Sequence, residues 1–239
     1  YARATGKVGV VIATSGPGAT NLVTGIATAM LDSIPLIAVT GNVASSQIGK
    51  DSFQEINITG VTMPITKHNY FVSDVADLAD TIREAFQIAK SGRPGPVLID
   101  IPKDVQTAEC LFESTGIIEE IPQKDADDAL IEKAVALINA AERPYIYIGG
   151  GAASVLSAED IKALADKIDA CIGCTFMGLT AGLGGCSRFL GMQGMHGTYA
   201  SSMANKEADL VIGIGVRFSD RATGNAEKYA SRAKVIHID

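Results

Sequence analysis

Short apolar runs alternate with amphipathic stretches along the first half of the chain. Residues 8–13, 35–40 and 97–101 are short runs rich in Val, Ile and Leu, as is typical of strands buried on both faces of a parallel sheet. Residues 21–32 predict a helix after the first run, and residues 74–90 place apolar side chains at helical spacing on one face. This strand–helix–strand order predicts parallel pairing with helical crossovers.

The same alternation restarts in the second half of the chain. Helices are predicted at residues 128–141 and 158–169, and strands at residues 145–148, 210–216 and 235–238. The chain therefore predicts an α/β fold with two consecutive open, mostly parallel sheets flanked by helices.

Two stretches lack this periodicity. Residues 42–62 predict mostly loop. After residue 102 the chain gains charge and Pro, and we assign residues 110–127 to a linker between domains. The linker divides the chain into a first domain, residues 1–109, and a second domain, residues 128–239.

Composition and charge narrow the class of function. The net charge is -7 and there is no basic cluster, which argues against a nucleic-acid partner because such binding needs concentrated Lys and Arg. No apolar run reaches membrane-spanning length, so we expect no membrane partner. Four scattered Cys suit a reducing, cytoplasmic location. The chain begins without Met and ends in a predicted strand, so we expect it to be a piece of a longer protein.

Three motifs have both a functional and a structural interpretation. The glycine-rich turn at residues 15–21 stands between a strand and a helix, where backbone N–H groups can meet an anion or simply form a tight turn. Residues 149–151 are three glycines that half-match the dinucleotide fingerprint, with Ser154 at the third glycine position, and packing is favoured there. Cys171 and Cys174 faintly resemble half of a zinc site, but free thiols are favoured.

Charged residues follow predicted strands in both halves. Arg217, Asp220 and Arg221 come just past a buried strand, where they could clamp an anion or form a surface salt bridge. His196 lies between glycines and is either a ligand donor or a structural loop residue. Lys103 also follows a strand directly, and strand ends of open α/β sheets are where ligands bind.

Taken together, these segments resemble the acetolactate synthase family of thiamine-diphosphate enzymes. Residues 1–7 (YARATGK), 13–21, 51–55 (DSFQE) and 91–105 (SGRPGPVLIDIPKDV) resemble its pyrimidine-binding domain. In the second half, GMHG, from residue 194, and GVRFSDRATG, from residue 215, resemble its middle domain, which binds FAD. The resemblance covers the whole chain, and the combination of motifs is specific although each motif alone is not.

The resemblance implies an activity and its cofactors. The family condenses two pyruvates, or pyruvate and 2-ketobutyrate, to acetolactate or acetohydroxybutyrate with loss of carbon dioxide, in branched-chain amino-acid biosynthesis. The implied cofactors are thiamine diphosphate, FAD and Mg²⁺, with the metal site outside this chain. The implied partners are 2-keto acids, further copies in a homodimer or homotetramer, and a small regulatory subunit. We expect the chain alone to be inactive.

The resemblance also implies roles for individual residues. Three residues match positions that line the substrate channel: Phe53, Gln54 and Lys103. Ser33 matches a position near thiamine diphosphate. The residues that match the flavin site are Arg93, His196, Gly197, Arg217, Phe218, Asp220 and Arg221, and Asp239 matches the acid beside the adenosine. The chain departs from the usual pattern at Asn42 and Ala44, at the channel mouth, which puts inhibitor sensitivity and substrate preference in doubt. It also departs at Ser219, which weakens one polar contact but leaves the Asp220–Arg221 pair.

Three other functions remain open at this stage. The chain could belong to another thiamine-diphosphate enzyme of the same layout, such as a pyruvate oxidase or a glyoxylate carboligase. As an isolated fragment it could be a non-catalytic module that binds FAD or NAD. The Cys residues leave a metal-binding redox protein as the third and least favoured alternative.

Overall fold

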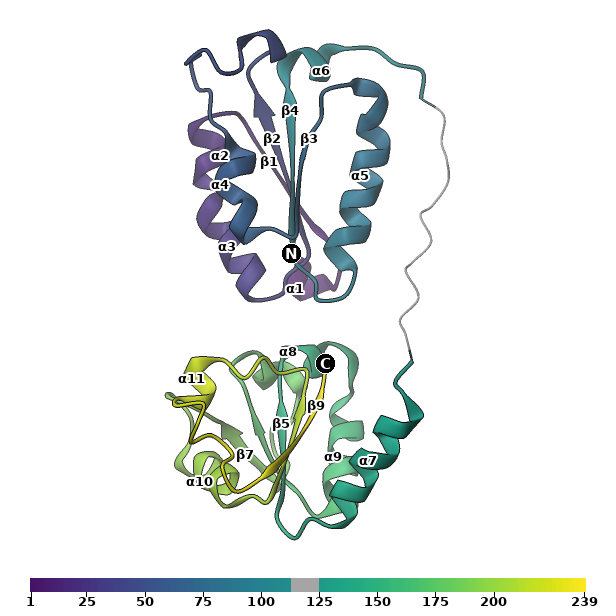
Figure 1. Cartoon of the computed structure of the whole chain (residues 1–239), viewed down its shortest axis with the longest axis vertical. Helices are drawn as coiled ribbons and strands as arrows, with labels where there is room; N and C mark the ends of the chain where they lie inside the picture. The colour runs from purple at the N-terminus through teal and green to yellow at the C-terminus, as the bar shows by residue number, and fades with distance from the viewer. Residues whose placement is uncertain (113–124) are drawn as a thin grey trace. The chain divides into compact units, whose positions relative to one another are not determined.

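The computed structural model describes residues 1–112 and 125–239, and the chain divides into two compact units, Tyr1–Gln123 and Lys124–Asp239 (Figure 1). We call these unit 1 and unit 2 and describe each by itself. Most of the predicted linker, residues 113–124, lies outside the described residues. Within the described ranges no helix combines the length and the apolar character needed to cross a membrane.

Unit 1 contains a four-stranded parallel sheet in the order β1-β2-β4-β3. Its strands are β1 (Gly9–Ala13), β2 (Leu36–Asn42), β3 (His68–Phe71) and β4 (Pro96–Pro102). The three strands predicted from apolar runs are confirmed as β1, β2 and β4, with small shifts at their ends. Sequence analysis missed β3, because its short sequence, HNYF, begins with two polar residues and forms no apolar run.

Helices cover both faces of this sheet (Figure 1). On one face α3 (Val23–Leu31) and α4 (Ile58–Thr62) contribute to a cluster around the fully buried Leu98. On the other face α5 (Val75–Lys90) buries Ala85 and Ala89 against the strands. The remaining helical segments of unit 1 are α1 (Ala2–Thr5), α2 (Pro17–Asn21), η1 (Ser45–Gln47), η2 (Met63–Ile65) and α6 (Lys103–Thr107).

The helix boundaries of unit 1 correct the predictions in detail. The helix expected at residues 21–32 is α3, preceded by the separate short helix α2, which Pro17 begins. Within the predicted loop at residues 42–62, α4 forms because the Asn57 side chain accepts a hydrogen bond of 2.9 Å from the Gly60 backbone N–H. In the stretch after residue 102, α6 is too short to show helical periodicity.

Unit 2 contains a five-stranded parallel sheet in the order β7-β6-β5-β8-β9. Its strands are β5 (Pro144–Ile148), β6 (Cys171–Cys174), β7 (Phe189–Met192), β8 (Leu210–Ile214) and β9 (Lys234–Ile238). β8 is shorter than predicted because Gly215, with a φ of 59°, turns the chain out of the strand. The parallel pairing in both sheets confirms the predicted fold class.

The two helices predicted in unit 2 are confirmed as α7 (Asp128–Asn139) and α9 (Ala158–Ile168). Sequence analysis missed α10 (Tyr199–Glu207), because its buried residues, Ser201 and Asn205, are polar and form no apolar stripe. The remaining helical segments of unit 2 are α8 (Gly150–Val155), η3 (Met177–Ala181) and α11 (Asp220–Thr223).

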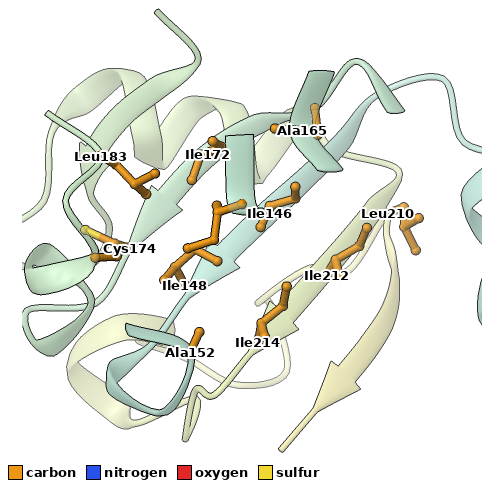
Figure 2. Close-up of a cluster of buried hydrophobic side chains, with 13 residues drawn as sticks. Ile146, Ile148, Ala152, Ala165, Ile172, Cys174, Leu183, Leu210, Ile212 and Ile214 are labelled. Carbon is orange, nitrogen blue, oxygen red and sulfur yellow. The ribbon is translucent and has the colours of Figure 1, made fainter. Parts of the chain in front are cut away.

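The main core of unit 2 consists of branched apolar side chains from its central strands (Figure 2). Ile146 and Ile148 of β5 lie beside Ile212 of β8, and all three are 0–1% exposed. Ala165 of α9 covers this cluster and is also fully buried. This packing fixes the positions of the strands in unit 2. It therefore also fixes the carboxyl ends of the strands, which the predicted flavin residues follow in the chain.

Candidate functional site

Unit 1 gathers polar residues at the edge where its strands end. Gln54 lies against the turn after β1, because a Cβ placed on Gly16 would stand only 2.8 Å from the Gln54 carbonyl oxygen. Glycine therefore permits this close approach. The neighbouring Phe53 is 87% exposed. Two of the predicted channel residues thus lie together at the carboxyl edge of the sheet, against the glycine-rich turn.

One carboxylate holds the loop that carries Phe53 and Gln54. The Glu55 side chain accepts hydrogen bonds from the backbone N–H of Gly49 and, at 3.0 Å, from that of Ser52. These bonds, led by the one from Gly49, lower the pKa of Glu55 below its usual value. The carboxylate is therefore ionised at neutral pH and fixes the shape of the loop.

Lys103 begins α6 at the same edge of the sheet. It directly follows Pro102, which pairs with Asn42 at the ends of β4 and β2. The next residue, Asp104, accepts hydrogen bonds from the backbone N–H (2.9 Å) and the hydroxyl (3.2 Å) of Ser45. Lys103 is exposed, and among the described residues its side chain has no hydrogen-bond or ion-pair partner. Its ammonium group is therefore available to an anionic ligand.

A buried carboxyl group that sequence analysis missed lies beside these residues. Asp100 is 1% exposed and accepts hydrogen bonds from the Thr40 hydroxyl (2.7 Å) and the Asn42 amide (2.6 Å). With Glu55 and Phe71 it lines a cleft of about 370 Å³. Burial raises the pKa of Asp100, and the two hydrogen bonds oppose this effect. The available signal was an acid inside an apolar run predicted to be buried on both faces.

We expect Asp100 and Asp104 to give opposite pH dependences of stability. Because burial raises the pKa of Asp100, its contribution to folding is present below its ordinary pKa of about 4 and is lost as pH rises through the higher pKa of the folded state. Asp100→Asn should abolish this loss. The pKa of Asp104 is lowered, chiefly by the backbone hydrogen bond from Ser45, so its contribution is lost as pH falls. Asp104→Asn should remove that acid-side loss.

Denaturant unfolding of the chain between about pH 3 and pH 8 measures both effects. Asp104→Asn is the matched control, because it also replaces a carboxylate at the carboxyl edge of unit 1. Equal pH profiles for the two variants would contradict the assigned directions.

Ser33 and Arg93 lie together at the opposite edge of unit 1. The Arg93 Nε donates a hydrogen bond of 2.7 Å to the Ser33 hydroxyl, and its Nη2 donates to the carbonyls of Met30 (3.0 Å) and Leu31 (3.3 Å) at the end of α3. Ser33 shortly precedes β2 and Arg93 shortly precedes β4, so both stand at the amino edge of the sheet. Unit 1 therefore does not bring them to Phe53, Gln54 and Lys103.

Three predicted site residues have a strained backbone. Ser33, Gln54 and Phe218 have φ values of 57°, 60° and 48°. In the described part of the chain, six non-glycine residues have a positive φ: Ser33, Asp51, Gln54, Asp169, Phe218 and Ala230. Each such residue costs roughly 1–3 kcal/mol, and such strain concentrates at functional sites. Half of the set coincides with the predicted site residues, which supports a functional interpretation of these positions.

Two of the three glycines after β5 in unit 2 pack their backbone against the end of β8. The Gly149 N–H donates to the Ile214 carbonyl (2.9 Å), and the Gly151 N–H donates to the Gly215 carbonyl (3.2 Å). A Cβ on Gly149 would stand 1.8 Å from the Gly215 oxygen. The N–H groups of Gly149 and Gly151 are thus occupied by the protein's own carbonyls, which favours the packing interpretation for these two residues.

The loop that carries His196 lies directly against α11. The Met195 N–H donates a hydrogen bond of 2.9 Å to the Arg221 carbonyl. A Cβ on Gly194 would stand 2.4 Å from that oxygen, and Gly194 has a φ of 103°, so glycine is required at this position. The Gly197 N–H donates to the Gly194 carbonyl (2.9 Å) and closes the loop. Exposed at its tip, His196 has no hydrogen-bond partner among the described residues.

Cationic side chains stand beside this loop at the end of β8. Arg217 is exposed and has no partner in the described part of the chain. The Arg221 Nε lies 3.7 Å from the Asp220 carboxylate, and these side chains are 70% and 82% exposed, so their ion pair is weak. Two guanidinium groups and an imidazole at the ends of parallel strands form a donor set that suits a diphosphate. The predicted residues of unit 2 therefore fit a dinucleotide.

Phe218 and Asp239 complete this edge. The Phe218 ring packs inward, with its centroid 5.0 Å from the His237 ring and 5.8 Å from the Tyr229 ring. His237 Nε2 lies 2.8 Å from the Val216 carbonyl oxygen and 3.4 Å from the Asp239 carboxylate. Asp239 directly follows β9, and its side chain is 54% exposed. Sequence analysis gave His237 no role, yet it connects these two residues.

The described cysteines are free thiols, and Cys171 and Cys174 lie on opposite faces of the sheet. Cys174 is buried in the core shown in Figure 2, whereas Cys171 packs in the cluster on the other face of the sheet. Among residues 1–112 and 125–239, no group of three or more His, Cys, Asp or Glu side chains could hold a metal ion. The first Cys pair therefore does not form half of one site.

Two family models match the two units. The thiamine pyrophosphate enzyme N-terminal TPP binding domain matches residues 1–61, and the thiamine pyrophosphate enzyme central domain matches residues 131–239. The chain belongs to the thiamine pyrophosphate enzyme family. It is thus a chain of a thiamine-diphosphate-dependent enzyme, as the resemblance implied.

Relatives of this family are similar to the whole chain. Acetolactate synthase 1, chloroplastic, of Nicotiana tabacum is 48% identical over 245 residues, which cover 100% of this chain and 36% of that protein. The acetolactate synthase large subunit of Corynebacterium glutamicum is 47% identical over 242 residues, covering 100% and 39%. That of Haemophilus influenzae is 43% identical over 244 residues, covering 100% and 43%. The chain therefore spans about two fifths of the length of these relatives.

Proposed function

We propose that this chain is part of the catalytic subunit of an acetolactate synthase, a carboligase that condenses two 2-keto acids with loss of carbon dioxide. The observation that carries the proposal is its 43–48% identity, across both units, to proteins of that name. The substrates would be two pyruvates, or pyruvate and 2-ketobutyrate, in branched-chain amino-acid biosynthesis.

The residues at the carboxyl edge of unit 1 suit 2-keto acids. Thiamine diphosphate, when bound, supplies the electron-sink chemistry. The unpartnered ammonium of Lys103 would hold the substrate carboxylate by a charge-assisted hydrogen bond. Gln54 would orient the same group through its amide, and the exposed ring of Phe53 would form an apolar wall for the methyl group. Together these residues fix the orientation of the substrate, which lowers the entropic part of the barrier.

The carboxyl edge of unit 2 suits FAD. Arg217 and His196, both free of partners among the described residues, would donate to the diphosphate together with Arg221. Asp239 would accept from ribose hydroxyls at the end of β9. Because the condensation of two 2-keto acids needs no net redox step, the flavin would have a structural role. We assign Mg²⁺ to residues outside this chain, as the resemblance implies.

We also propose that the parent protein assembles as a homodimer or homotetramer, with a small regulatory subunit as a further partner. The separation of the predicted site residues between the two edges of unit 1 supports an active site that is built from more than one copy of the chain. Ser33 and Arg93 stand at the amino edge, and Lys103 at the carboxyl edge, so one copy of unit 1 does not unite them. Sedimentation of the full-length protein as a single copy would overturn this part of the proposal.

A product assay with pyruvate tests the proposed reaction. The full-length protein, supplied with thiamine diphosphate, Mg²⁺ and FAD, should form acetolactate. This chain alone should turn over no pyruvate, because it spans only 36–43% of the length of its relatives. Acetyl phosphate from pyruvate would instead indicate a pyruvate oxidase, and tartronate semialdehyde from glyoxylate would indicate a glyoxylate carboligase. Flavin binding by the full-length protein without any turnover would favour a nucleotide-binding module.

A further inference from the structure

A buried polar network lies beneath the cationic edge of unit 2. Its centre is the hydroxyl of Tyr229, which lies between α11 and β9 in the chain. The Gln193 Nε2 donates to this hydroxyl at 3.3 Å. The ring of Tyr229 packs edge-on against Phe218, with centroids 5.8 Å apart. Tyr229 therefore contacts both the segment after β8 and the end of β7.

Gln193 also connects the end of β7 with the segment that follows β8. It is 6% exposed and immediately precedes the loop of residues 194–197, which carries His196. Its Nε2 also approaches the Ala222 carbonyl of α11 at 3.5 Å. One side chain thus reaches from the base of the loop to α11 and to Tyr229.

Asn205 is a further buried polar residue of this region. It lies on α10 and is 8% exposed. Burial raises the pKa of Tyr229, and the hydrogen bond from Gln193 opposes this effect. The Tyr229 hydroxyl therefore stays protonated at neutral pH and remains a neutral partner for Gln193.

The network is not fully satisfied. The Gln193 Oε1, the Asn205 Oδ1 and the Tyr147 hydroxyl are buried, and none has a hydrogen-bond partner within the described residues. Each such group costs roughly 1–3 kcal/mol, more than a typical neutral hydrogen bond returns. The two contacts of the Gln193 amide, with the Tyr229 hydroxyl and the Ala222 carbonyl, instead fix the geometry between the end of β7 and α11.

We infer that Gln193 and Tyr229 form a clasp that positions the loop of residues 194–197 against the segment of residues 217–221. The inference rests on the proposed flavin site, to which both segments belong. Gln193 is buried and Tyr229 is partly buried, and both act through other residues: they set the separation of His196 from Arg217 and Arg221. They are positioning residues, and the clasp is preformed before any cofactor arrives.

Amide hydrogen exchange of the full chain tests the clasp without a cofactor. Tyr229→Phe removes the hydroxyl and keeps the ring on Phe218, so the Met195 N–H, which bonds to Arg221, should exchange roughly three- to tenfold faster. Tyr145→Phe is the matched control. It removes a buried hydroxyl bonded to Ser201 at 2.8 Å that touches neither segment, and the Met195 exchange should not change. Gln193→Leu is a second variant and should act like Tyr229→Phe.

A flavin titration of the same variants completes the test. Tyr229→Phe and Gln193→Leu should weaken FAD binding by roughly three- to tenfold, and Tyr145→Phe should leave it unchanged. Equal Met195 exchange in Tyr229→Phe and Tyr145→Phe would overturn the clasp, and so would faster exchange with unchanged FAD affinity. If the unchanged chain binds no FAD, the proposed flavin site fails, and the exchange experiment alone then decides whether the clasp exists.

Discussion

Gly149→Ala should destabilise unit 2 by about 3 kcal/mol or more. The added Cβ would stand 1.8 Å from the Gly215 carbonyl oxygen and 2.5 Å from its carbon, and both are backbone atoms. Relief requires the turn after β5 to move away from the end of β8. That movement breaks the hydrogen bond from the Gly149 N–H to the Ile214 carbonyl (2.9 Å). A change of side-chain rotamer cannot relieve this clash, because the close atoms belong to the backbone.

Hydrogen exchange of the β5 amides measures this loss, and the amides of β2 in unit 1 serve as an internal reference. Gly184→Ala is the control, because nothing lies within 4 Å of a Cβ at that position. Wild-type protection of β5 in Gly149→Ala would show that the two turns are not packed as described.

Arg217→Ala should weaken FAD binding to the chain by roughly 10- to 100-fold, the effect of losing charge-assisted hydrogen bonds to a phosphate. The fold should be unaffected, since the Arg217 side chain is exposed and has no partner in the described part of the chain. A titration followed by flavin absorbance or fluorescence measures the dissociation constant. Because the interaction is ionic, the loss should shrink as salt concentration rises.

Arg232→Ala is the control for this titration. Arg232 is also exposed and also in unit 2, but in the chain it lies between Tyr229 and β9 and belongs neither to the loop of residues 194–197 nor to the segment of residues 217–221. Its replacement removes the same charge and should leave the affinity within about twofold of the unchanged chain. Similar losses in both variants would indicate non-specific attraction of the anion, and the assignment of Arg217 to a flavin site would be wrong.

The parts of the fold that sequence analysis predicted are those with a strong local signal. β4 is buried at every position, and its apolar sequence, interrupted only by Asp100, indicates this directly. β7 has no fully buried residue and only four positions, so its apolar residues form too short a run to indicate a strand. α10 buries Ser201 and Asn205, and a helix whose buried face is polar escapes any search for an apolar stripe.

The residues of the candidate site also divide into those that have a local sequence signal and those that do not. Charged residues that follow a predicted strand, such as Lys103 and Arg217, could be located because the ends of parallel strands meet at one edge. Contacts between distant residues could not. Gln193 and Tyr229 are 36 positions apart, and Thr40 and Asp100 are 60 apart. Nothing local to either partner indicates that the two side chains meet.

β2 and β4 are each seven residues long and are paired along their whole length, from Leu36 opposite Pro96 to Asn42 opposite Pro102. The two strands therefore fix the distance between the amino and carboxyl edges of the sheet in unit 1. An insertion or deletion inside either strand would turn its side chains to the wrong faces and displace the chemistry at both ends in one event. The loops at either end of unit 1 can change in sequence and length independently of each other. The distance between the two ends stays constant, because the paired strands β2 and β4 set it.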